Sequence, residues 1–308
     1  METQTKINQQ KIVPCLWFDD NAAQAIELYI SCFKNASHGK TTYYDKNSAK
    51  ASGRPEGSLL TETFMLNGQE FMALNGGPYY KLNPAVSFFV NCQSEDEIDL
   101  LYQKLSVKGK ILMEYKSYPF SKKYAWIEDE FGLSWQLNLT GEPQKINPML
   151  MFNGKNAGKA QEAIDFYTSV FNNSKTLFIA HYEEGLGEPT ENIVHARFSL
   201  DGEEFLAMDS SRHYDYSISP SISFMIFCAD QQEVDYFWEK LTEGGKEVEC
   251  GWLEDKYGVS WQVVPTVFLQ MITQPDKERA GRVMQAMLKM KKIDIPTLQE
   301  AYGEATEK

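Results

Sequence analysis

Hydrophobic residues along this chain recur with two alternating periods, one typical of strands and one typical of helices. Short apolar runs precede segments whose apolar residues fall on one helical face, and extended segments joined by turn dipeptides follow. The turns are Asn67-Gly68 and Asp201-Gly202, which tolerate the positive φ of a two-residue hairpin. This order predicts β-α-β-β-β modules. Their first strands are expected at 12–18 and 146–152, and their helices begin at Asn21 and Asn156, whose side chains can cap free amides.

The same pattern restarts later in each half of the chain. A strand is again followed by a helix, and each helix begins with the residue spacing of a capping box. Further strands close each half, so the pattern predicts two modules per half. The second strands are expected at 85–91 and 221–227, and the capping boxes are Ser94 with Glu97 and Asp230 with Glu233.

The two halves are copies of one another. The segment WIEDEFGLSWQL at 126–137 returns as WLEDKYGVSWQV at 252–263, with seven of twelve positions identical. Before this segment the first copy carries ILMEYKSYPFSKKYA and the second only EVECG, so the second copy has lost most of a strand or its loop. Self-similarity in this order predicts two tandem domains and a tail. The expected boundaries are 11–140, 145–266 and 267–308.

A helical tail is expected after the second copy. Its pattern is amphipathic from about 276 to 291, and a shorter helical segment is expected at 296–302. The apolar stripe either packs on its own domain or forms a dimerising or partner-binding surface, and the sequence leaves both open. The stripe consists of Val283, Met284, Met287 and Leu288.

Composition argues against nucleic-acid and membrane partners and against secretion. The net charge of −13 disfavours contact with phosphate backbones, so nucleic acid is not an expected partner. No stretch approaches the roughly 20 apolar residues that a membrane helix needs, so no membrane partner is expected either. The polar start METQTKINQQ lacks a secretory signal, which favours a cytoplasmic location. The five cysteines are odd in number and form no C-x-x-C pair, which is typical of reduced core thiols.

The paired modules, the Asn-Ala-x-x-Ala-Ile-x-x-Tyr pattern of the first helix and the Asp-x-x-Gly-x-Ser-Trp-Gln final strand resemble the vicinal oxygen chelate superfamily of glyoxalases, bleomycin-resistance proteins and extradiol dioxygenases. Within it, the chain is most similar to the PhnB-like branch, whose C-terminus the tail also resembles. The resemblance implies an α+β fold in which tandem domains, each of two βαβββ modules, form half-open β-cups that hold a ligand. Members of this branch are often labelled as methyltransferases, yet the chain has no Gly-rich loop typical of a dinucleotide or S-adenosylmethionine fold.

The resemblance also implies where a divalent metal would bind. Its glutamate ligand lies on the final strand, four residues after the Gly of Asp-x-x-Gly, where this chain has Gln136 and Gln262. A neutral amide is a poorer ligand for a divalent ion than a carboxylate, and it cannot act as a general base. The first strands offer no His. We therefore expect no metal and no other cofactor, with a divalent metal in the second domain as the alternative.

The second copy carries a polar set that the first lacks. Side-chain alternation places His195 and Arg197 opposite Phe198, and Asp209 follows on the next strand. His195 could act as a general acid or base or anchor a metal, Arg197 could bind an anion, and Asp209 could orient the His; a solvated or salt-bridged surface is the alternative. The first copy has Thr61, Thr63, Asn75 and Gln136 in the matching places, while Gln262 completes the second set.

Two further tryptophans flank these candidate cups. Trp126 and Trp252 lie at the mouth of each final strand and either close the cup or fill the core, whereas Trp135 and Trp261 are expected in the core. We expect a cytoplasmic small-molecule-binding protein whose ligand is unknown and whose site lies in the second copy. The alternative is a metal-dependent enzyme of glyoxalase or dioxygenase type, and catalysis stays undecided. Two fused copies could pair within one chain, and a homodimer is also possible.

Overall fold

The computed structural model describes residues 10–303, so most of the polar N-terminal segment on which the cytoplasmic expectation rests lies outside the described residues. Strands and helices alternate as predicted and build four modules followed by a helical tail, which is an α+β fold. No helix within 10–303 is long and apolar enough to cross a membrane.

The modules follow the predicted order of strands and helices, except for a short helix in module 1 and a 3₁₀ turn in module 3 that were not predicted. Module 1 comprises β1 (Ile12–Phe18), α1 (Ala22–Cys32), β2 (Ser37–Tyr43), α2 (Lys46–Ser52), β3 (Leu59–Leu66) and β4 (Gln69–Asn75). Module 2 comprises β5 (Val86–Cys92), α3 (Glu95–Leu105), β6 (Lys110–Tyr118), β7 (Ser121–Glu128) and β8 (Ser134–Leu139). Module 3 comprises β9 (Lys145–Phe152), the 3₁₀ turn η1 (Gly154–Asn156), α4 (Ala160–Val170), β10 (Lys175–His181), β11 (Ile193–Leu200) and β12 (Glu203–Asp209). Module 4 comprises β13 (Ile222–Cys228), α5 (Gln231–Thr242), β14 (Lys246–Glu247), β15 (Trp252–Glu254) and β16 (Ser260–Pro265).

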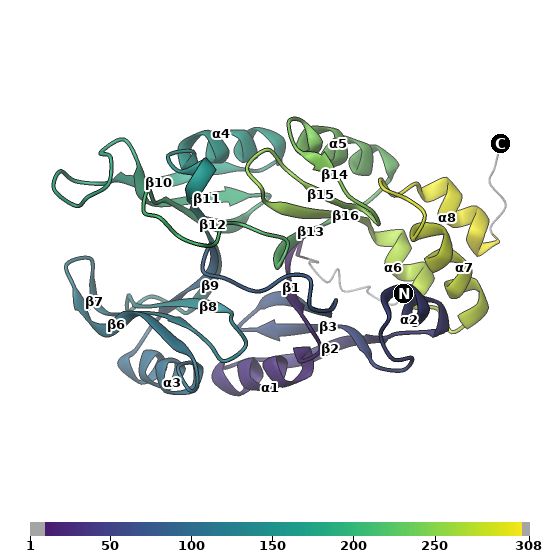
Figure 1. Ribbon diagram of the computed structural model, residues 1–308, viewed down its shortest axis with the longest axis horizontal. Coiled ribbons are helices and arrows are strands. Elements are labelled where there is room, and N and C mark those ends of the chain that lie inside the picture. Colours follow the sequence, from purple (N-terminus) through teal and green to yellow (C-terminus); the bar gives the residue numbers. More distant parts are fainter. Residues whose placement is uncertain (1–9, 304–308) are drawn as a thin grey trace, which may run out of the picture.

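Each sheet joins a module of one repeat to a module of the other. Sheet A has the strand order β14-β15-β16-β13-β1-β4-β3-β2, and sheet B has the order β10-β11-β12-β9-β5-β8-β7-β6. The modules meet through antiparallel pairs, β1 with β13 in sheet A and β5 with β9 in sheet B. Figure 1 shows sheet A toward the right and sheet B toward the left of the molecule. The sequence pattern defined the modules but not this exchange between repeats.

Helices cover one face of both sheets, and the main core lies between. Figure 1 shows α1 and α3 along one side of the molecule and α4 and α5 along the opposite side. Trp135 and Trp261 are fully buried in this core, as side-chain alternation predicted. Trp135 Nε1 donates to Asp129 Oδ2 at 2.9 Å, and Trp261 Nε1 donates to Asp255 Oδ2 at 2.8 Å. In each repeat of the Asp-x-x-Gly-x-Ser-Trp-Gln segment, the Asp of the turn is therefore hydrogen-bonded to a tryptophan of the core.

The predicted capping boxes are confirmed at the start of α3 and α5. Ser94 Oγ accepts a hydrogen bond from the Glu97 amide at 3.3 Å, and Asp230 Oδ1 accepts one from the Glu233 amide at 2.9 Å. These bonds satisfy amides that would otherwise be free in the first helical turn.

The predicted asparagine caps are wrong. Asn21 precedes α1, but its side chain makes no capping hydrogen bond. Asn156 lies in η1, so α4 begins four residues later, at Ala160. The Asn156 amide instead donates to the main-chain oxygen of Tyr257 at 2.5 Å, which joins two turns of the second repeat. Sequence pattern alone did not distinguish a capping asparagine from one that bridges turns.

The tail forms three helices that cover the face of sheet A opposite its outer helices. They are α6 (Thr266–Ile272), α7 (Lys277–Met287) and α8 (Ile295–Tyr302), and only the last two were predicted. Figure 1 shows them gathered at the sheet A end of the molecule. Val283 from the predicted apolar stripe is fully buried there, whereas Leu288 is 38% exposed. The stripe thus packs inside the same chain.

We expect Leu298→Ala to lower the free energy of unfolding by about 2–5 kcal/mol, because a fully buried leucine leaves a cavity when it is truncated. The half-exposed Leu288 provides a control with the same substitution, expected to cost less than about 1 kcal/mol. Urea unfolding of both variants measures the difference. Equal costs would contradict the packing of α8 against sheet A.

Candidate ligand cup

Each sheet has a second face, away from its outer helices, on which alternate side chains of the strands gather. On sheet A this face carries Val13 and Cys15 from β1. The tail buries it, and one apolar cluster joins strands and tail. The cluster contains Val13, Cys15, Met225, Phe227, Val264, Phe268, Met271, Val283, Ile293 and Leu298.

The corresponding face of sheet B carries an apolar cluster that the tail does not reach. We call this face the sheet B cup. Its members come from both repeats, because sheet B combines modules 2 and 3. The cluster consists of the buried Phe89, Tyr124, Met149 and Leu206, with Met113, Tyr118, Trp126 and Met208 packed partly buried against them.

The second copy has only a short β14–β15 hairpin, and the tail docks against its turn. The short β14–β15 connection leaves the amides of Cys250 and Gly251 free, and they donate to the main-chain oxygens of Met290 and Lys291, each at 2.7 Å. Gly251 has φ +81°, and a Cβ there would lie 3.0 Å from Ile293. The tail therefore docks against the shortened turn. In sheet B the longer β6–β7 hairpin occupies the matching position.

The predicted glutamines occupy equivalent places on the two faces. Gln136 Nε2 donates to Ser87 Oγ at 2.9 Å in sheet B, and Gln262 Nε2 donates to Ser223 Oγ at 2.9 Å in sheet A. Tyr124 also donates its hydroxyl to Gln136 Oε1, at 2.7 Å. Both glutamines are thus held in neutral hydrogen-bond networks between neighbouring strands.

Beside Gln262, the tail buries a thiol. Burial raises the pKa of Cys15 to about 11, although hydrogen bonds from Gln262 and Ser223 partly oppose the shift. The thiol stays protonated at neutral pH, and it lies under the tail as part of the sheet A cluster.

His195 faces the sheet B cup but lacks the partners predicted for it. Its ring centroid lies 5.7 Å from that of Phe89 and 6.3 Å from that of Phe178. Burial lowers the pKa of His195, and the nearby Arg197 charge lowers it further, so the imidazole is mainly neutral at pH 7. Arg197 Nε donates to Glu204 Oε1 at 2.7 Å, which pairs the guanidinium within the protein.

The prediction that Asp209 orients His195 is wrong, because the two side chains lie on opposite faces of sheet B. Asp209 is 1% exposed, and its Oδ1 accepts from the Ala160 amide at 3.0 Å while Oδ2 accepts from the Ile193 amide at 2.9 Å. The carboxylate therefore holds the first turn of α4 and the start of β11. Burial raises its pKa, and these backbone hydrogen bonds oppose the shift.

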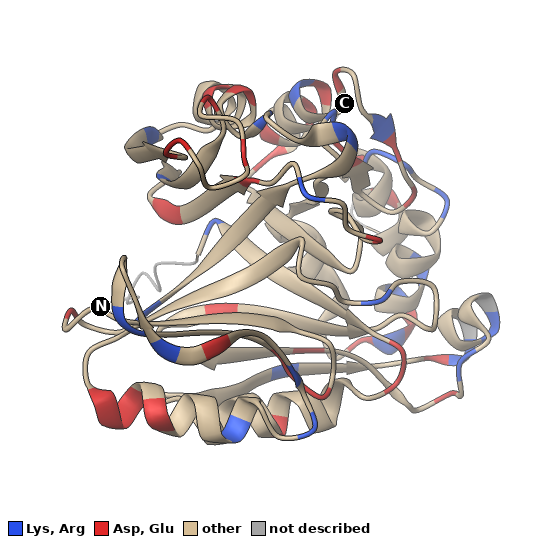
Figure 2. Ribbon diagram, turned by 60° about the vertical axis from the view of Figure 1, so that its left-hand side comes forward, with Lys and Arg blue, Asp and Glu red and all other residues tan. Residues whose placement is uncertain are grey.

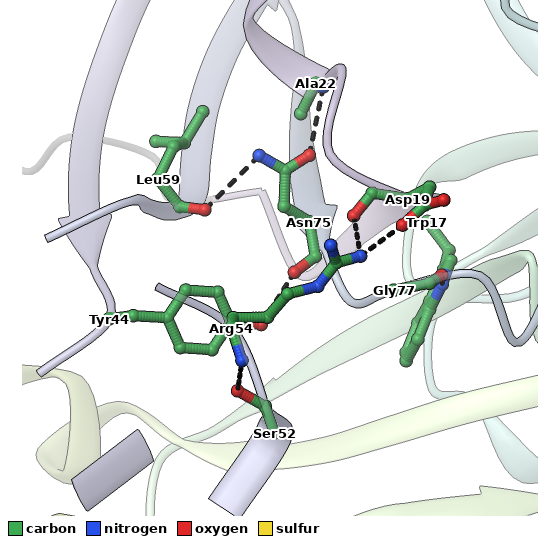
Figure 3. Close-up of polar contacts among 9 residues, drawn as sticks. All are labelled: Trp17, Asp19, Ala22, Tyr44, Ser52, Arg54, Leu59, Asn75 and Gly77. Atoms are coloured by element: carbon green, nitrogen blue, oxygen red, sulfur yellow. Dashed lines mark hydrogen bonds and ion pairs between the residues drawn. The ribbon is translucent and has the colours of Figure 1, made fainter. Parts of the chain in front are cut away.

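Asn75 likewise holds the first turn of α1 in the first repeat, as Figure 3 shows. Its Oδ1 accepts from the Ala22 amide at 3.0 Å, and its Nδ2 donates to the Leu59 main-chain oxygen at 3.2 Å. Tyr44 donates its hydroxyl to the main-chain oxygen of Asn75 at 2.6 Å, and Arg54 pairs with Asp19 nearby. Asn75 and Asp209 supply the helix-start bonds that the predicted asparagine caps do not.

The remaining candidates are divided between the sheets, so the prediction that Gln262 joins His195 in one cup is wrong. Gln262, Thr61, Thr63 and Trp252 belong to sheet A, whereas Gln136 and Trp126 belong to sheet B. The threonines are already hydrogen-bonded: Thr61 Oγ1 lies 2.6 Å from Thr42 Oγ1, and Thr63 Oγ1 accepts from the Lys40 amide at 2.9 Å.

The two flanking tryptophans also differ in surroundings. Trp126 packs partly buried in the sheet B cup and donates its Nε1 to Ser134 Oγ at 2.8 Å. Trp252 forms an edge contact with Trp17, with ring centroids 6.1 Å apart. Of these two, Trp126 is the one that lines the sheet B cup.

Sequence reasoning missed Asn147 as a site residue. It lies on β9 two positions before Met149, on the same face of the strand, and pairs in register with Phe89. The side chain is 7% exposed, and its buried Nδ2 has no hydrogen-bond partner. A buried donor without a partner costs about 1–3 kcal/mol, so it marks a place where a ligand group would be stabilised. The signal in the sequence was a polar residue in the apolar run INPMLMF.

The side chains of this cup do not match a divalent-metal site. Gln136 occupies the position implied for the carboxylate ligand, and its amide is held by Ser87 and Tyr124. Within residues 10–303, no group of three or more His, Cys, Asp or Glu side chains is placed to hold a metal ion. The groups at the implied ligand position are therefore a neutral amide and neutral hydroxyls.

Two clefts lie outside the cups and are related by the repeat. One, of about 490 Å³, is lined by the end of β1 and the turns around Lys81, Lys108 and Glu130. The other, of about 210 Å³, is lined by Asn153, Glu254 and neighbouring residues. Lys108 and Glu130 pair at 3.3 Å, so this lining contains an internally paired cation and anion.

A family model described as 3-demethylubiquinone-9 3-methyltransferase matches residues 10–138 and 144–264, which are the two repeats. The chain belongs to that family. No curated protein matches this PhnB-like chain.

Solved structures resemble either one repeat or both. A PhnB protein from Bacillus cereus with the same methyltransferase description is 41% identical over 42% of this chain and 100% of its own, with a TM-score of 0.39. Glyoxalase I from Zea mays is 15% identical over 83% of this chain and 92% of its own, with a TM-score of 0.54. A dioxygenase-described protein from Bacillus subtilis is 9% identical over 82% and 83%, with a TM-score of 0.50. The last two share the two-repeat fold of this chain.

We expect Asp209→Asn to reduce the free energy of unfolding by about 1–3 kcal/mol, because its new N–H group would face either the Ala160 or the Ile193 amide, donor against donor. The exposed Asp215 offers the same substitution as a control, with less than about 0.5 kcal/mol expected. Chemical denaturation of both variants decides. A cost for Asp209→Asn no larger than that of the control would refute its role in holding α4.

Proposed function

We propose that this PhnB-like protein binds one small apolar molecule per chain, in the sheet B cup, without a metal ion. Membership of the family and the glyoxalase-like fold support small-molecule binding in general. The observation that favours sheet B is the contrast between the two faces. The tail fills one with apolar side chains, whereas the other keeps an apolar cluster with an unpartnered buried donor, Asn147.

The chemistry of the cup favours binding of an apolar body. Phe89, Met149 and Leu206 form a buried apolar floor. The partly buried Met113, Trp126 and Met208 leave apolar surface for a ligand, and burying such surface contributes roughly 25 cal/mol per Å² removed from water. The neutral His195 and the Tyr124–Gln136 pair lie among them and can fix orientation by hydrogen bonds. Ligand sites of this kind combine an apolar lining with a few placed polar groups.

Methyl transfer, which the family description names, is not part of this proposal. The sequence has no Gly-rich loop of the kind that a dinucleotide or S-adenosylmethionine fold uses, and each sheet is built of βαβββ modules joined by antiparallel strands. His195 supplies a neutral base that could move a proton, so the proposed cup accommodates either sequestration or proton-transfer chemistry.

The binding site can be tested with the uncharged fluorophore N-phenyl-1-naphthylamine, whose emission rises in apolar surroundings. We expect saturation at one probe per chain. Met208→Trp, which adds bulk inside the cup, should weaken binding at least tenfold. Leu74→Trp is the matched control at the equivalent position of sheet A, and it should leave affinity unchanged. Two probes per chain, or loss only in the control, would overturn the assignment to sheet B.

Metal content is checked separately by elemental analysis of the purified full chain. We expect less than about 0.1 equivalent of any divalent transition metal, because both positions implied for a carboxylate ligand carry glutamine. A stoichiometric metal that is lost in the His195→Ala variant would instead support the metal-dependent alternative.

A further inference from the structure

We infer that the ligand of the sheet B cup is an uncharged aromatic molecule whose carbonyl, or a similar acceptor, takes a hydrogen bond from Asn147 Nδ2. This inference rests on the proposed binding function and specifies its ligand chemistry. Three features of the cup carry it: an unpartnered donor, a lining of aromatic rings and sulfur atoms, and the internal pairing of its charges.

Asn147 supplies a hydrogen-bond donor at a position where the equivalent residue of sheet A is apolar. Asn147 of β9 and Val13 of β1 are equivalent positions of the two repeats, 134 residues apart. Val13 is 1% exposed and packs against the tail, which completes an apolar cluster. Asn147 is nearly as buried, yet its Nδ2 lacks a partner. The chain thus places a costly polar group on the one face that no tail helix covers, and a ligand acceptor would remove that cost.

The lining favours a flat aromatic ring. Trp126 is the partly exposed ring of the lining, and the buried rings of Phe89 and Tyr124 lie in the same cluster. Aromatic rings prefer offset or edge contacts with another ring. Met149 and Met208 add thioethers, which contact aromatic edges favourably and adapt their shape to a ligand. A saturated chain would fill the same space without using these contacts.

Charge pairing disfavours an ionic ligand. Arg197 bonds to Glu204, and Lys145 Nζ lies 3.8 Å from the same carboxylate, so both cations already have an anionic neighbour. His195 is mainly neutral at pH 7. Figure 2 shows acidic and basic residues concentrated on the outer helices and loops, while the central strands are largely uncharged. An ionised ligand would lose hydration in this apolar cup without gaining an unpaired partner.

Three naphthalenes of similar size separate these features. In equilibrium titrations followed by thermal shift and tryptophan fluorescence, 2-acetylnaphthalene should bind about tenfold tighter than 2-ethylnaphthalene, because only the first accepts a hydrogen bond. The anionic 2-naphthoate should bind at least tenfold weaker than 2-acetylnaphthalene. Equal or tighter binding of 2-naphthoate would overturn the uncharged assignment.

Asn147→Val copies the residue of the filled face and tests the donor. We expect the preference for 2-acetylnaphthalene over 2-ethylnaphthalene to disappear while 2-ethylnaphthalene binding is kept. The ligand-free Tm should rise, because an unsatisfied donor is removed. Asn147→Ser, which can still donate, should retain part of the preference. Asn91 lies on β5, on the same face of sheet B, and its side chain accepts a hydrogen bond from Asn138. Asn91→Val should leave the preference intact.

The outcomes separate this inference from the proposed function. If the naphthalenes bind and Met208→Trp blocks them, but Asn147→Val leaves the preference unchanged, the donor role is wrong and the cup remains a binding site. A fall in ligand-free Tm in Asn147→Val would likewise show that the amide serves structure. If no probe binds, or Met208→Trp has no effect on those that do, the cup itself is not the site and both proposals fail.

Discussion

The antiparallel pairing of β1 with β13 and of β5 with β9 is the constraint on which the rest of the structure depends. Each pair joins modules from different repeats, so neither eight-stranded sheet can form from one repeat alone. The same pairing decides which side chains share a face. It brings Phe89 and Tyr124 of the first repeat beside Met149 and Leu206 of the second. Any ligand held there contacts both repeats.

Divergence of the repeats has made the two faces unequal. The second repeat lacks the long hairpin, and the tail uses the freed amides of Cys250 and Gly251 to dock in its place. Once docked, it buries the inner face of sheet A with apolar side chains. That face contributes to stability as a second core. The inner face of sheet B instead has a buried polar side chain, Asn147, that a purely structural core would not require.

The repeated residues serve structure more than chemistry. Asp129 and Asp255 each accept a hydrogen bond from a core tryptophan, and Asn75 and Asp209 each hold the first turn of a helix. Such pairs hold equivalent turns and helix starts in both repeats. Other equivalent places differ between the repeats, and the proposed ligand contact, Asn147 against Val13, is one of them.

Local pattern by itself determined the modules, the capping boxes at Ser94 and Asp230, the burial of Trp135 and Trp261, and the family. These depend on side chains a few residues apart, whose spacing is visible in the sequence. Only the tertiary structure decided that Gln262 lies on a different sheet from His195 and that Asp209 faces away from that histidine. It also decided that the tail covers the inner face of sheet A. The physical reason is that repeated modules offer chemically similar strand edges. Pairing within a repeat and pairing between repeats satisfy the same local pattern, and long-range packing selects between them.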